Sequence, residues 1–254
     1  MTLLENPGGN YRFLTGIAPY SAGVVAMAGY EIVRVTLQTP LPYRQGFDLI
    51  DRHLASLACP RQALCAVELR LPQPLTFTGF NAFNAKYRTL LTEWAILLGD
   101  LNPVARTNIA PALHPPSEPA LYAFSYTVVS ADPLALPTFV VAGAGDLRDQ
   151  AQLSAAAVVR PGETSAHALR EKASAVMGEM TARLLGLQMD WSHVTAVDVY
   201  TAQPIHAILR TEILEQIGAA AAHGVHWYYS HPPIADLIFE MDLRGIRQEV
   251  RVRG

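Results

Sequence analysis

The chain has 254 residues, of which 50% are hydrophobic and 16% are charged, and its formal net charge is −3. A charged fraction so far below the ~25% of typical soluble proteins indicates a large core and an apolar subunit interface. The chain has no excess of positive charge, so the composition argues against a nucleic-acid partner.

The N-terminus and the cysteines favour a soluble, cytoplasmic protein without a membrane partner. Glu5 and the lack of a basic residue before Arg12 are unlike a secretory signal, and the most apolar window, residues 17–33, falls short of a membrane span. Cys59 and Cys65 are typical of small core residues in a reducing compartment.

The first half of the chain alternates predicted strands and helices. Phe47, Ile50 and Leu54 follow one another at spacings of three and four residues, which is one face of a helix. In chain order we expect a strand at 29–37, a helix at 46–58, a strand at 64–71, a helix at 78–94, an arginine-bearing strand within 102–111 and a strand at 121–129.

The second half repeats this order. Met177, Met180 and Leu184 lie 130 positions after Phe47, Ile50 and Leu54 (177 − 47) and present the same face. We expect a strand at 138–143, helices at 165–187 and 205–217, and strands at 194–201, 225–229 and 237–243. With a linker at 130–133, the pattern predicts two α+β units, residues 1–130 and 131–254, each a mixed sheet with two helices on one face.

Arg106 is the first candidate for binding chemistry. It lies between a Pro-Val-Ala lead-in and a short strand-like run. A guanidinium presents a fixed, charged fork that matches a carboxylate, so this position suits an anion clamp. The alternative is a surface arginine paired with a nearby acid.

Five short motifs follow one another in an order known from one enzyme family. They are residues 18–24 (APYSAGV), 84–87 (NAKY), 104–109 (VARTNI), 140–143 (VVAG) and 237–242 (LIFEMD). Together they resemble the RidA (YjgF/YER057c/UK114) family of enamine/imine deaminases, in two tandem copies that cover nearly the whole chain.

The resemblance implies a fold, an assembly and a reaction. The fold would be two tandem chorismate-mutase-like (RidA/YjgF-type) domains, and the assembly a homotrimer of six units with clefts between units. The reaction would be hydrolysis of a small enamine or imine carboxylate, such as 2-aminoacrylate or 2-aminomuconate, to a 2-oxo acid and ammonia, without a metal or cofactor.

The resemblance also assigns site residues, but neither copy holds a full set. Arg106 would bind the substrate carboxylate, Glu240 would handle the attacking water, and His223 stands where the second copy should have its arginine. Because these losses are complementary, a composite cleft with Arg106 and Glu240 on facing walls is one interpretation, and decay of one or both copies is the other. The expected cleft lining is Tyr20, Asn84, Asn108, Ala142 and Gly143.

Other chemistries are weaker interpretations of the same residues. His223 and His226 have opposite parity on a strand, which argues against a shared zinc ion. The Gly-Ala-Gly-Asp run at 143–146 lacks the helix start that a dinucleotide loop needs. Two functions stay open beside the deaminase: a non-catalytic carboxylate-binding or assembly protein, and a chorismatase-like lyase or hydrolase.

Overall fold

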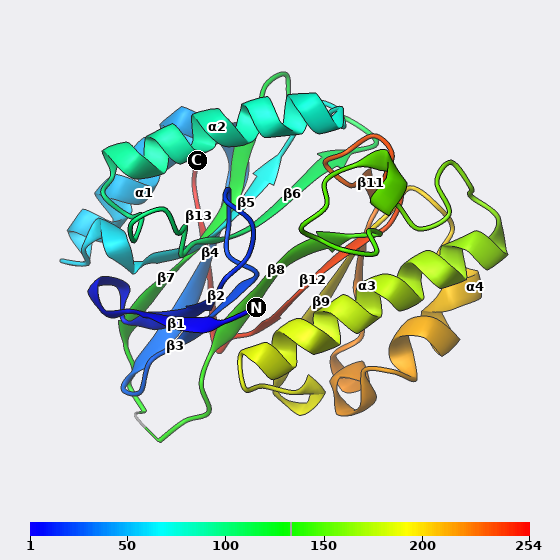
Figure 1. Ribbon diagram of the computed structural model, residues 1–254. Helices are drawn as coiled ribbons and strands as arrows, with labels where there is room; N and C mark the ends of the chain where they lie inside the picture. The colour runs from blue at the N-terminus through cyan, green and yellow to red at the C-terminus, as the bar shows by residue number, and fades with distance from the viewer. Residues whose placement is uncertain (133) are drawn as a thin grey trace.

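Two facing β-sheets with helices on their outer sides make up the fold, which the computed structural model describes for residues 1–132 and 134–254 (Figure 1). Pro133, in the predicted linker, lies outside the described residues. No helix in these ranges is long and apolar enough to cross a membrane. The helices are α1 (Tyr43–Ser56) and α2 (Phe77–Glu93) over one sheet, and α3 (Ala166–Gly186) and the short α4 (His206–Ile208) over the other.

The sheets have seven and six strands, and both are mixed. The seven-stranded sheet has the order β1 (Leu3–Asn6), β2 (Tyr11–Leu14), β3 (Gly23–Ala26), β8 (Phe139–Gly145), β12 (Glu240–Gly245), β9 (Ala196–Tyr200) and β10 (His226–Tyr228). The six-stranded sheet has the order β11 (Ser230–His231), β6 (Ala105–Pro111), β5 (Leu64–Arg70), β7 (Ala120–Val129), β4 (Tyr30–Pro42) and β13 (Gln248–Val252). Short 3-10 turns link these elements: η1 (Pro7–Gly9), η2 (Arg61–Ala63), η3 (Ala155–Ala157), η4 (Trp191–His193) and η6 (Gly218–His223).

The three long helices form where the apolar periodicity predicts them. Their apolar faces pack on the sheets, with Phe47 and Ile50 of α1 and Met180 of α3 almost fully buried. Side chains cap two of them: Thr76 accepts a hydrogen bond from the backbone of α2, and Ser165 does the same for α3. Such caps satisfy backbone N–H groups that have no partner within the helix.

The helix expected at 205–217 forms over residues 206–214, but only its first turn is α-helical. After α4 the chain winds as a π-helical turn, η5 (Leu209–Leu214). Ile208 and Ile213 are five residues apart and both are fully buried. Winding with i→i+5 hydrogen bonds returns residues at that spacing to one side, so the wider turn buries both isoleucines.

The prediction of two tandem RidA-type domains is wrong, because strands from both ends of the chain cross between the sheets. The N-terminal strands β1, β2 and β3 extend the sheet built mainly from the second half of the chain. In return, β11 and β13 pair with β6 and β4 of the other sheet. Each sheet therefore contains strands from both sides of residue 130, whose role as a domain boundary stays a prediction.

Charged side chains lie between the two sheets. Arg34 on β4 forms a bidentate pair with Glu68 on β5, at 2.6 and 2.9 Å. Arg244 on β12 donates to Asp198 on β9 at 2.6 Å. Glu249 on β13 accepts from Arg244 at 2.9 Å and from Arg34 at 3.5 Å, which joins the two sheets. The sheets thus meet through ion pairs as well as apolar contacts.

Candidate active site

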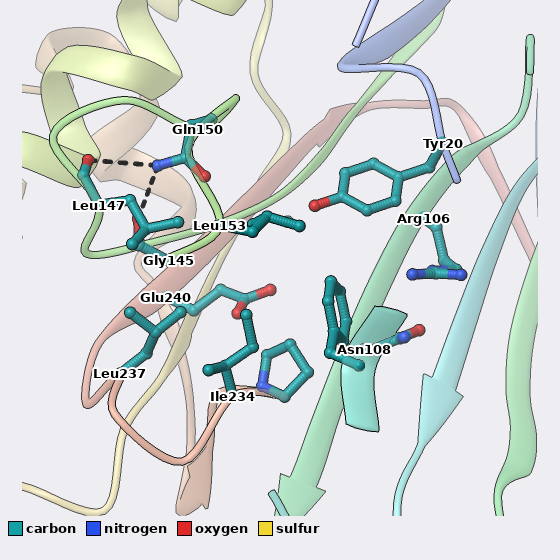
Figure 2. A pocket seen from close by; sticks show the side chains of 13 residues that line it. Tyr20, Arg106, Asn108, Gly145, Leu147, Gln150, Leu153, Ile234, Leu237 and Glu240 are labelled. Atoms are coloured by element: carbon teal, nitrogen blue, oxygen red, sulfur yellow. Dashed lines mark hydrogen bonds between the residues drawn. The ribbon is translucent and has the colours of Figure 1, made fainter. Parts of the chain in front are cut away.

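A narrow cleft opens where β6 of one sheet approaches β8 and β12 of the other (Figure 2). Figure 2 shows the Tyr20 hydroxyl and the Glu240 carboxyl pointing into it, with Arg106 and Asn108 on the wall that belongs to β6. The lining residues are Tyr20, Phe80, Arg106, Asn108, Gly143, Gly145, Leu147, Gln150, Leu153, Pro233, Ile234, Leu237 and Glu240. The cleft is thus mostly apolar, with a few converging polar groups, as small-molecule sites usually are.

Arg106 is the buried cation of the cleft, with only 3% of its surface exposed. Its Nη2 donates to Oδ1 of Asn84 on α2 at 2.5 Å. The guanidinium lies 4.6 Å from the ring centroid of Tyr87 and 5.0 Å from that of Tyr20. Burial lowers the pKa of Arg106 from its usual value, and no carboxylate forms a salt bridge with it in the described part of the chain.

Several buried polar atoms around Arg106 have no hydrogen-bond partner among the described residues. They are Nη1 of Arg106, Nδ2 of Asn84, Nδ2 and Oδ1 of Asn108, and the hydroxyl of Tyr87. An unsatisfied buried donor costs ~1–3 kcal/mol, so a cluster of them is unfavourable unless a ligand supplies partners. A carboxylate accepts several hydrogen bonds and carries a negative charge that balances the positive charge of Arg106. It therefore fits the donors in this group.

Glu240 is the acid of the cleft and its side chain crosses over Gly143. A Cβ at residue 143 would collide with Oε1 of Glu240, so the carboxyl can take this position only above a glycine. Burial and the nearby charge of Asp242 raise the pKa of Glu240 well above its usual value. Glu240 is therefore a carboxyl that holds its proton at a pH where most glutamates are ionised.

A buried ion pair fixes the backbone that leads into Glu240. Nζ of Lys172 donates to Oδ2 of Asp146 at 2.7 Å, and both side chains are fully buried. The other oxygen, Oδ1, accepts from the backbone of Ile238 at 3.0 Å and of Phe239 at 3.3 Å. The position of Glu240 thus depends on a contact between the end of β8 and α3.

Most of the residues expected at the site lie in this cleft or against it, and their chemical roles stay predictions. Asn84 lies behind Arg106 rather than in the lining. Ala142 packs between the sheets, and its carbonyl accepts from Arg183 at 2.9 Å. His223 is apart from the others, exposed at the end of η6, because the segment that holds it is a helical turn and not a strand. The residues that line the cleft as expected are Tyr20, Arg106, Asn108, Gly143 and Glu240.

Two irregular segments supply lining residues that the sequence analysis did not select. Leu147, Gln150 and Leu153 come from the loop after β8, and Ile234 from the turn before β12. Nε2 of Gln150 donates to the carbonyls of Gly145 at 2.8 Å and Leu147 at 3.4 Å, which shapes this loop. Neither segment has a periodic pattern, and the only signal was the pair of prolines ahead of residue 234.

A family model described as 2-aminomuconate deaminase CnbZ matches residues 3–250. The chain belongs to this family. It is 37% identical over 244 residues to 2-amino-5-chloromuconate deaminase of Comamonas testosteroni, an alignment that covers 96% of each protein. A crystal structure of chorismatase superposes with a TM-score of 0.45 at 11% identity, covering 96% of this chain and 89% of that one.

The family match corrects the expected membership of the RidA family. A single model that spans the chain, and not two RidA-like copies, accounts for its motifs. The homotrimer of six units followed from the RidA resemblance and stays a prediction.

Proposed function

We propose that the protein hydrolyses 2-aminomuconate or a close relative of it to the corresponding 2-oxo acid and ammonia. Membership of the CnbZ family and the aminomuconate deaminase at 37% identity support this substrate class. The observation that carries the proposal is the presence in one cleft of a buried Arg106, which has no carboxylate partner among the described residues, and a Glu240 of raised pKa. One group suits a carboxylate, and the other suits proton transfer.

The carboxylate beside the amino-bearing carbon binds to Arg106 in this proposal. The free Nη1 of Arg106 and the free Nδ2 of Asn108 supply donors for its two oxygens, while Asn84 holds Arg106 from behind. The rest of the planar diene lies against the apolar wall formed by Leu237 and its neighbours. Binding at a buried arginine fixes the amino-bearing carbon relative to Glu240, which converts binding energy into orientation.

Glu240 carries the proton through the reaction. Its carboxyl first protonates the enamine carbon, which gives an iminium ion and leaves a carboxylate. That carboxylate takes a proton from water as the oxygen bonds to the iminium carbon. Glu240 then protonates the nitrogen, the C–N bond breaks to release ammonia, and the proton of the new hydroxyl returns to Glu240 as the carbonyl forms. A carboxyl group with a raised pKa can both donate and accept a proton near neutral pH, as these steps require.

Ammonia release from 2-aminomuconate tests the proposal. Arg106→Met removes the charge with little change in length, and we expect a large rise in KM. Glu240→Gln keeps the shape without the proton, and we expect a fall in kcat of ~10²-fold or more. Glu171→Gln on the solvent side of α3 is the matched control and should behave as the wild type. Carboxylate binding without turnover by the wild type would favour the non-catalytic function instead.

A further inference from the structure

A chain of polar groups runs between the sheets from the cleft to the surface. Glu240 is directly opposite Tyr200 in the register of β12 and β9, and Asp242 is opposite Asp198. Residues two apart on a strand share a face, so these four side chains lie on the same side of the sheet. The Tyr200 hydroxyl is 3.0 Å from Oδ2 of Asp242 and 3.4 Å from Oδ2 of Asp198.

The outer end of this chain is a histidine at the surface. Nδ1 of His226 is 2.7 Å from Oδ1 of Asp198. The His226 side chain is 57% exposed, whereas that of Asp198 is fully buried. The hydrogen bond to Asp198 raises the pKa of His226 from its usual value. His226 therefore exchanges protons with solvent while it contacts a carboxylate that solvent does not reach.

The charges around Asp242 favour a proton on this residue. Burial and the neighbouring carboxylates of Asp198 and Glu68 raise its pKa to about 7. Asp198 stays ionised, because hydrogen bonds from His226 and Arg244 outweigh the effect of burial and hold its pKa at about 2. The charged and polar groups that face Asp242 are Arg34 from β4, Glu68 from β5, Thr107 from β6, Asp198 and Tyr200 from β9, and Glu240 and Arg244 from β12.

We propose that Asp242, Tyr200, Asp198 and His226 form a proton path that connects Glu240 with solvent. The inference rests on the proposed function. The reaction returns a proton to Glu240, but ammonia is a stronger base than a carboxylate and takes that proton as it leaves the cleft as ammonium, so Glu240 is ionised until another proton arrives. Glu240 is 4% exposed even before substrate fills the cleft, which limits direct supply from solvent.

Each step of the path moves one proton and balances. An O–H bond forms on Glu240 as that of Asp242 breaks, between two carboxyl groups that are neighbours on one face of β12. Because Asp198 is ionised at rest, it first takes a proton from the His226 imidazolium. It then passes this proton to the Tyr200 oxygen as the Tyr200 hydroxyl gives its own proton to Asp242, and His226 takes a new proton from solvent. The net change is one proton moved from solvent to Glu240.

Steady-state kinetics of Tyr200→Phe and His226→Ala test the path. Tyr200→Phe removes the bridging hydroxyl, and we expect kcat for 2-aminomuconate to fall at least about tenfold with little change in KM. His226→Ala should lose a similar factor, and added imidazole should restore it. The matched control is Tyr228→Phe, because its ring stacks on Tyr200 at 5.1 Å but its hydroxyl is outside the chain of contacts.

Equal kcat values for Tyr200→Phe and Tyr228→Phe, or no rescue of His226→Ala by imidazole, would overturn the path. An independent readout separates this failure from that of the proposed function. The infrared band of the buried Asp242 carboxyl should exchange with D2O more slowly in Tyr200→Phe than in Tyr228→Phe, whatever the substrate. A wild type that releases no ammonia but shows this difference would contradict the function alone. Equal exchange rates would contradict the path.

Discussion

Gly143 is the position where a single added carbon should separate the site from the fold. Beyond the collision with Oε1 of Glu240, a Cβ there would lie 3.1 Å from Cγ2 and 3.2 Å from Oγ1 of Thr107. The backbone at Gly143 does not have a left-handed φ, so Gly143→Ala acts through sterics alone. The Thr107 contacts are tight but tolerable, whereas the carboxyl of Glu240 has to move.

The expected size of this effect follows from the two contacts. Mild overpacking costs ~1–3 kcal/mol of stability, so Gly143→Ala should still fold. Displacement of Glu240 by about 1 Å should lower kcat for ammonia release by ~10²-fold. The matched control is Gly178→Ala on α3, where a Cβ meets nothing within 4 Å. This control should keep its activity and gain ~0.5–1 kcal/mol, because alanine is the better helix former.

Thermal unfolding and ammonia release, measured on both variants, test whether Gly143→Ala impairs the reaction while the protein stays folded. A Gly143→Ala protein that is folded and turns over at the rate of the wild type would refute the reasoning. In that case the position of the Glu240 carboxyl would not matter for the reaction.

Three further predictions concern stability, pH and binding. Lys172→Met leaves Asp146 buried without its ion pair and should lower the free energy of unfolding in urea by ~3–5 kcal/mol. Arg61→Met breaks an exposed pair and should lower it by at most ~1 kcal/mol. Equal losses in the two variants would contradict the role given to burial. Because Glu240 acts as an acid and burial raises its pKa, kcat/KM should be constant below that raised pKa and fall as pH rises through it; a rate that instead rises with pH would mean that the ionised form is active. Asn84→Ala removes the hydrogen bond that orients the anchoring arginine and should raise KM about tenfold with a smaller change in kcat, and an unchanged KM would show that packing alone holds the guanidinium.

Apolar patterning predicted the three long helices and eight of the strands, and it missed the shortest and most polar strands. Helix α3 and strand β5 formed within a residue or two of expectation, because each has a continuous apolar face to bury. Strands β1 to β3 are only four residues each, too short for a pattern. The polar strand β13 is mostly exposed, so only its pairing with β4 defines it.

Long-range pairing is also why the prediction of two tandem RidA-type units failed. The core strand orders are β6-β5-β7-β4 in one sheet and β10-β9-β12-β8 in the other. The strands that join one half to the other lie at the ends of the chain, far in sequence from their partners. No local pattern reports such pairing, because a strand is defined by its own residues while its neighbours are set by tertiary contacts.

For the candidate site, the sequence supplied chemical types but not their distances. Arg106 stood out as a lone cation on a predicted strand and Glu240 through the family resemblance, and the structure brings both to one cleft. Their proximity depends on β6 approaching β8 and β12 across two sheets. His223 was chosen from a supposed repeat, and the segment that holds it is the helical turn η6 instead. The buried groups around Asp242 could not be predicted from the sequence either, because they come from five strands that only the tertiary fold brings together.

The most direct test of the account is the discrimination between a carboxylate and an amide next to the reacting carbon. The wild type should hydrolyse 2-aminomuconate with a kcat/KM ~10–100-fold above that for the derivative whose C1 carboxylate is a primary amide, because charged hydrogen bonds to Arg106 contribute ~1.5–3 kcal/mol. Arg106→Met should lose most of this preference while Glu171→Gln keeps it. Equal preference in the wild type and in Arg106→Met would contradict the claim that Arg106 binds that carboxylate.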